Sequence, residues 1–145
     1  DLLAAIGVGQ LERFEASQQR RYALVERYRA GLAAVPEVRV PGTRDGMTHA
    51  WHLFTIALEL DRLSIDRARF IEELRAENIG TSVHFIPIHF HPHWRDTLGY
   101  GPGSFPVAEA AYQRAITLPL FATMTDRDVD DVVLAVAKVA AAFRA

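Results

Sequence analysis

Histidine is the residue type with the clearest chemical potential in this sequence. Four of the six histidines lie in the stretch VHFIPIHFHPHW, residues 83–94, and the other two lie in THAWHLF, residues 48–54. Imidazoles bind zinc, nickel or copper, and they also donate hydrogen bonds to phosphate and hydroxyl oxygens. The cluster is therefore compatible with a metal site, with one wall of a ligand-binding cleft, or with a polar loop whose histidines bond locally.

A metal site is the least supported of these three readings. His89, His91 and His93 alternate, so in an extended strand their side chains would leave from one face. Pro87 and Pro92 interrupt a regular strand here, and the stretch has no Asp or Glu to complete or orient a ligand set. We therefore predict no native metal site.

Other common catalytic arrangements are missing. Ser82 and Ser104 lie outside any G-x-S-x-G motif, and no G-x-G-x-x-G or Walker-type loop occurs. The chain has no cysteine, which excludes disulfides, thiolate ligands and thiol nucleophiles. All but one of its 16 cationic side chains are arginine, so Lys138 is the only candidate for an amine nucleophile.

The overall charge and hydropathy narrow the class of protein. The net charge is −2, with the two signs interspersed, so no basic surface is expected for a nucleic acid or an anionic membrane. No apolar run of about 18 residues and no basic signal region occur. We predict a soluble cytoplasmic protein with no nucleic-acid or membrane partner.

The periodicity of the apolar residues indicates how these side chains are positioned. Helices are predicted over residues 2–35 (two helices or one bent helix), 64–78, 107–115 with Pro106 first, and 126–143 capped by Thr125; strands are predicted over 38–40, 49–60, 80–87 and 116–120. Residues 94–105 are predicted as an aromatic, glycine-rich loop. This order predicts a single α+β domain, residues 1–145, with a small, mainly antiparallel sheet covered by helices.

Five segments together resemble the C-terminal part of the DegT/DnrJ/StrS-type aminotransferases. They are AAIGVGQL (4–11), AWHLF (50–54), IGTSVHFIPIH (79–89), ITLPLF (116–121) and MTDRDV (124–129). Enzymes of this family depend on pyridoxal phosphate (PLP) and have the aspartate-aminotransferase fold, PLP fold type I. They install amino groups on nucleotide-linked keto sugars. The resemblance implies the fold of the family's small C-terminal domain.

The resemblance also implies a site. Similar proteins carry an H-[YF]-x-P-x-H-x-H-P loop that borders the cleft for PLP and the sugar nucleotide. His84 and Phe85 match its start and are expected to touch cofactor or sugar, whereas His89 and His91 are expected to shape the loop. His93 has no implied role, and the resemblance assigns no catalytic residue and no metal ligand to this chain.

The same resemblance implies that the covalent chemistry lies elsewhere. In the family, the N-terminal domain supplies the lysine that binds PLP, the aspartate at the pyridine nitrogen and most phosphate contacts. Lys138 matches no family motif for that lysine, so the chain alone is expected to bind no PLP and to be inactive. The complete enzyme would be a homodimer that transfers an amino group, from glutamate, to a nucleotide-linked keto sugar.

Asp1 falls inside a longer family segment, N-x-R-M-x-[DE]-x-x-A-A-I-G, whose first half is missing. We therefore expect the chain to be part of a longer enzyme, without its N-terminal PLP-lysine domain, and to expose apolar surface on residues 2–35 that promotes self-association. Two alternatives stay open. One is a stand-alone, non-catalytic ligand-binding or assembly domain, and the other is a dehydratase-like relative.

Overall fold

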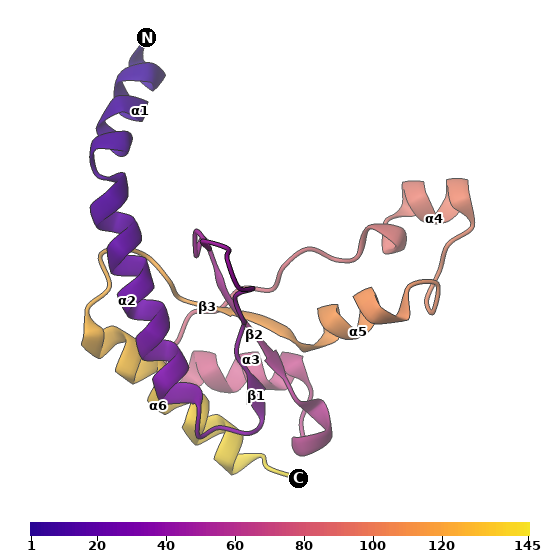
Figure 1. Cartoon of the computed structure of the whole chain (residues 1–145). Coiled ribbons are helices and arrows are strands. Elements are labelled where there is room, and N and C mark those ends of the chain that lie inside the picture. The colour runs from indigo at the N-terminus through magenta and orange to yellow at the C-terminus, as the bar shows by residue number, and fades with distance from the viewer.

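The protein has a small antiparallel sheet, as predicted, and six helices, of which α4 was not predicted. The computed structural model describes residues 1–145, and the three strands lie in the order β1-β2-β3. Figure 1 shows their arrangement. The elements are α1 (Leu2–Glu12), α2 (Phe14–Leu32), β1 (Val38–Arg39), β2 (Phe54–Leu58), α3 (Arg67–Ala76), α4 (Pro92–Leu98), α5 (Pro106–Arg114), β3 (Ala115–Leu118) and α6 (Asp126–Ala142), with 3-10 turns at Leu60–Arg62 and Ile88–Phe90.

The core lies between the sheet and helices α2, α3 and α6. On the central strand β2, Phe54, Ile56 and Leu58 are fully buried and alternate with half-buried residues, which confirms the predicted apolar face. Tyr28 of α2 stacks on Phe54 with ring centroids 4.7 Å apart. These residues belong to one cluster of 22 buried apolar side chains.

Local signals set the ends of the two helices that close this core. Thr125 caps α6, where its side chain accepts from the Asp128 backbone N–H and Asp128 accepts from the Thr125 backbone N–H. Asp66 caps α3 by accepting from the Arg69 backbone N–H. Asn78 follows α3 with φ 63°, the predicted left-handed conformation.

The predicted strand 49–60 is too long, because the observed strand starts at Phe54. Trp51 has φ 45°, which takes the backbone out of the extended conformation. His49 Nδ1 accepts a hydrogen bond from the Trp51 backbone N–H at 2.8 Å. Side chains of α2 hold this turn, since Gln18 donates to the Ala50 carbonyl and Arg21 to the Trp51 carbonyl.

The predicted strand 80–87 is wrong. Only Ser82 pairs with β3, through two backbone hydrogen bonds with Thr117 of 2.8 and 3.1 Å. The chain then leaves the sheet, so the ladder ends after one bridge. The predicted loop 94–105 is wrong in part, because Pro92–Leu98 forms α4, with Pro92 in its first turn and Gly99 at φ 69° after its end.

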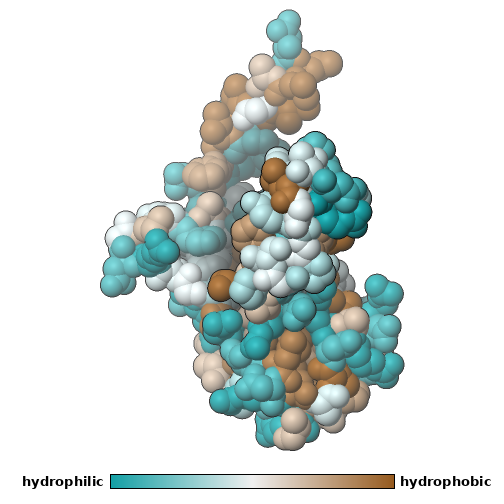
Figure 2. Space-filling model, turned by 90° about the vertical axis from the view of Figure 1, so that its right-hand side faces the viewer, coloured by the Kyte–Doolittle hydropathy of each residue, from teal (hydrophilic) through white to brown (hydrophobic).

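Two parts of the chain extend away from the body. Residues 83–105, here called the arm, carry α4 at the right of Figure 1. Helix α1 extends at the N-terminal end, and all its residues except Gly9 are exposed. Figure 2 shows its apolar side chains at the top of the view. No helix in residues 1–145 combines the length and the apolar character that crossing a bilayer requires.

Candidate functional site

The arm carries all four predicted site residues, but it places them in different surroundings. The His84 side chain is half-buried, and its buried Nε2 has no hydrogen-bond partner. The Phe85 side chain is 94% exposed. His91 is exposed, whereas His89 is 5% exposed. Phe85 and His91 are therefore on the surface, whereas the His84 Nε2 and the His89 side chain are buried.

Glu109 of α5 joins the outgoing and returning halves of the arm. Its carboxylate accepts from the Gly103 backbone N–H at 2.9 Å and from the Phe105 backbone N–H at 3.1 Å. It also lies 2.9 Å from His89 Nε2. The N–H group of Gly103, followed by those of Phe105 and His89, lowers the pKa of Glu109. The ionised carboxylate accepts, so Nε2 carries the proton in this hydrogen bond.

The sequence reading missed Glu109. One signal in the sequence could have identified it. Glu109 lies in the first turn of the helix that follows the glycine-rich stretch GYGPGSF, where a carboxylate can accept backbone N–H groups. In the structure Glu109 helps to explain the burial of His89, because it gives the imidazole N–H a charged acceptor.

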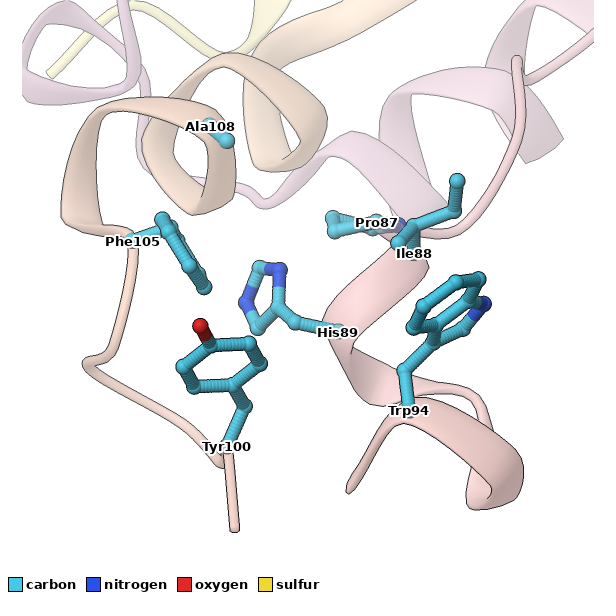
Figure 3. A pocket seen from close by; sticks show the side chains of 7 residues that line it. All are labelled: Pro87, Ile88, His89, Trp94, Tyr100, Phe105 and Ala108. Atoms are coloured by element: carbon cyan, nitrogen blue, oxygen red, sulfur yellow. The ribbon is translucent and has the colours of Figure 1, made fainter. Parts of the chain in front are cut away.

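A cavity of about 300 Å³ opens beside His89. Figure 3 shows the imidazole between Trp94 on one side and Tyr100 and Phe105 on the other. The Phe105 and His89 ring centroids are 4.8 Å apart. The seven lining residues are Pro87, Ile88, His89, Trp94, Tyr100, Phe105 and Ala108. Trp94, Tyr100 and Phe105 are not among the predicted site residues, because the sequence predicts only a loop over residues 94–105.

The only lysine lies elsewhere. Lys138 is on α6, which is on the side of the molecule away from the arm (Figure 1), and its Nζ donates to Glu77 at 2.7 Å. An amine that holds PLP must reach the cleft that holds the substrate. Lys138, paired with Glu77 on the side of the molecule away from the arm, therefore does not fit a covalent PLP site beside the arm.

The arm's histidines do not converge as metal ligands. No group of three or more His, Asp or Glu side chains in residues 1–145 is arranged to hold a metal ion. His89, one of the three alternating histidines, instead bonds to Glu109.

The family model of the DegT/DnrJ/EryC1/StrS aminotransferases matches residues 1–137. The chain belongs to this family. Two relatives show how much of such a protein the chain represents. It is 46% identical over 139 residues to an uncharacterized protein of Methanocaldococcus jannaschii, a match that covers 96% of the chain and 36% of that protein. It is 42% identical over 137 residues to the spore coat polysaccharide biosynthesis protein SpsC of Bacillus subtilis, covering 94% of the chain and 35% of SpsC.

Solved members of the family have the same fold over this region. Spr1654 from Streptococcus pneumoniae, in its PLP form, matches with a TM-score of 0.88 and 27% identity, over 98% of this chain and 36% of that one. DesV from S. venezuelae matches with a TM-score of 0.85 and 29% identity, over 94% and 35% of the two chains. The chain thus spans about a third of the length of the DegT/DnrJ/EryC1/StrS proteins that it matches. These matches confirm the predicted family and fold class.

Proposed function

We propose that residues 1–145 form the C-terminal small domain of a PLP-dependent sugar aminotransferase. One observation carries the proposal: the family match runs over residues 1–137, while the chain spans only about a third of its relatives. The complete enzyme, a homodimer, would transfer an amino group from glutamate to a keto sugar linked to a nucleotide. The N-terminal domain would hold PLP covalently and bind the nucleotide sugar together with this domain.

Within this domain, the arm would provide one wall of the cleft. His84 and Phe85 would contact cofactor or sugar. The Phe85 ring is 94% exposed, and the half-buried His84 has a buried Nε2 without a hydrogen-bond partner. His89 and His91 would shape the arm, His89 through its bond to Glu109. PLP, when bound, supplies the electron sink for the transfer. The residues of this chain would only orient the sugar and exclude water.

The chain by itself would not transaminate, and PLP addition tests this directly. The purified chain is mixed with PLP, reduced with borohydride and digested, and Lys138 is examined by mass spectrometry. We expect no visible absorbance band of a PLP–lysine adduct beyond that of free lysine, since Lys138 is exposed and paired with Glu77.

Lys138→Arg is the matched control, because it keeps the charge and removes the amine. A saturable band that borohydride fixes at Lys138 and that Lys138→Arg abolishes would contradict the proposal. The chain would then carry its own covalent cofactor site.

A further inference from the structure

The turn before β2 holds Trp51 in a conformation that large side chains rarely adopt. Trp51 has φ 45°, in the left-handed region, although its side chain is buried in the core. A bulky residue keeps such a backbone only where its surroundings determine it, and positions of this kind gather at sites and at segments that switch conformation. The contacts that hold this turn therefore show what could release it.

Side chains of α2 hold the carbonyl groups of the turn. Gln18 donates to the Ala50 carbonyl at 3.0 Å. Arg21 donates to the Trp51 carbonyl at 3.0 Å and to the Leu120 carbonyl at 3.1 Å. An amide does not ionise and a guanidinium stays protonated, so these bonds are the same in acid and at neutral pH.

The N–H side of the turn depends on an acceptor that can ionise. The Trp51 backbone N–H donates to His49 Nδ1 at 2.8 Å. In many turns an Asn or Asp side chain accepts from the N–H two residues later, and here an imidazole takes that place. A protonated imidazole has two donors and no acceptor, so Nδ1 accepts only while it carries no proton. His49 is exposed, so water can deliver that proton.

The His49 ring also packs against the core through Trp51. The two rings stack with centroids 4.0 Å apart, and the Arg29 guanidinium lies 5.0 Å from the Trp51 ring centroid. Trp51 in turn contacts Phe54, the first residue of β2, with centroids 6.2 Å apart. A movement of His49 therefore reaches the start of β2.

Charges near the turn oppose a further positive charge there. Glu26 pairs with Arg29 at 3.0 Å, whereas Arg21 has no carboxylate partner. Protonation of His49 therefore adds a second uncompensated cation to the same turn. The other charged or titratable groups at the turn are Glu15 of α2, which lines a cavity of about 400 Å³ with Thr48 and Ala50, and the exposed Arg44, Asp45 and His52.

We propose that His49 is a pH-dependent switch: the neutral imidazole holds the turn at Trp51, and its protonation releases the turn. The released segment has a second conformation available, because the alternating apolar residues of 49–60 favour an extended strand. The switch lies within residues 18–54 and requires neither PLP nor a sugar, so it goes beyond the proposed function.

Nuclear magnetic resonance of the ¹⁵N-labelled chain tests the switch as the pH is lowered from about 8 to about 5, the range in which histidines change charge. We expect the Trp51 amide signal to move with the ring signals of His49. Its exchange with water should become about fivefold faster than pH alone dictates, because one hydrogen bond is lost. The amide of Ile56, in the middle of β2, should stay in place.

Three variants assign the titration to one histidine. His49→Asn supplies an acceptor that does not ionise, so the turn should persist and the Trp51 amide should no longer move with pH. His49→Phe keeps a flat ring without an acceptor, so this amide should show at high pH the position that the unsubstituted chain reaches only in acid. His52→Asn is the matched control, an exposed histidine of the same turn, and it should leave the titration unchanged.

A Trp51 amide that stays in place over this pH range would overturn the proposal. A titration that persists in His49→Asn, or one that His52→Asn abolishes, would overturn it too, because another group would then be ionising. The amide spectrum shows whether each variant is folded, and if His49→Asn is not, His49→Phe and His52→Asn still decide. None of these results depends on whether PLP is trapped on Lys138.

Discussion

At the scale of single residues, Glu109 connects three parts of the arm. Its one carboxylate binds two backbone N–H groups of residues 99–105 and the imidazole of His89. The sequence predicts ligand contacts for His84 and Phe85, whereas Glu109 fixes His89 and the backbone at Gly103 and Phe105. A substitution of Glu109 should therefore act on the arm as a whole.

The arm should respond to acid through Glu109. Hydrogen bonds from Gly103, Phe105 and His89 lower its pKa in the folded protein. The stabilisation is therefore present above the ordinary glutamate value of about 4.3 and is lost as the pH falls through the lower folded value. We expect the amide signals of Gly103 and Phe105 to titrate with a midpoint below that ordinary value.

Glu109→Gln is the control for this titration, since its amide oxygen still accepts but does not ionise. The variant should lose the titration step at the two amides. A midpoint at or above the ordinary glutamate value in the unsubstituted chain would show that the carboxylate is not held as described.

At the scale of elements, the start of α6 illustrates a strong local signal. Thr125 and Asp128 form a reciprocal capping box. Thr125→Ala removes the side-chain acceptor of the Asp128 N–H, and we expect the free energy of unfolding to fall by about 1 kcal/mol, measured by urea denaturation. Thr123→Ala is the matched control, an exposed threonine two residues earlier. Equal losses in both variants would argue against the cap.

The contact between α2 and α6 depends on a residue without a side chain. A Cβ built on Gly31 would lie 2.8 Å from Val133 Cγ1. Gly31→Ala should therefore force the helices apart or rotate Val133, and we expect a loss of about 1–2 kcal/mol in urea denaturation. Gly9→Ala is the control, because nothing lies within 4 Å of its added methyl group. A neutral or stabilising Gly31→Ala would mean that the helix contact adapts freely.

At the scale of the whole molecule, α1 has no partner. Leu2, Leu3 and Leu11 are 83%, 84% and 75% exposed, and Ile6 is 59% exposed. A helix that is apolar on every side belongs in the interior of a larger body, which agrees with a chain that spans a third of its relatives. When α1 is not covered by another domain, its exposed apolar surface promotes self-association.

We expect residues 1–145 alone to form dimers or larger species, measured by sedimentation at increasing concentration. Leu3→Glu combined with Leu11→Glu should shift the distribution toward monomer, because both charges lie on α1. Leu134→Glu is the control for added charge, because Leu134 is an exposed apolar residue of α6. A strictly monomeric chain at high concentration would contradict the expectation.

The sequence by itself determined the elements whose cause is local. Caps, apolar periodicity and proline placed α2, α3, α5, α6 and the β2 face, because each signal acts within a turn or two of the chain. The resemblance of its motifs also determined the family, and it named His84, Phe85, His89 and His91 as site residues before their surroundings were known.

Only the tertiary structure decided where the strands end and what the histidines contact. No strand forms after Gly80, because the chain leaves β3 after a single bridge at Ser82, and β2 starts late because α2 side chains hold the turn at Trp51. His89 meets Glu109 across 20 residues of sequence. Such contacts depend on how segments far apart in the sequence pack together in space. The spacing of residues along the chain does not show which of these segments will be neighbours.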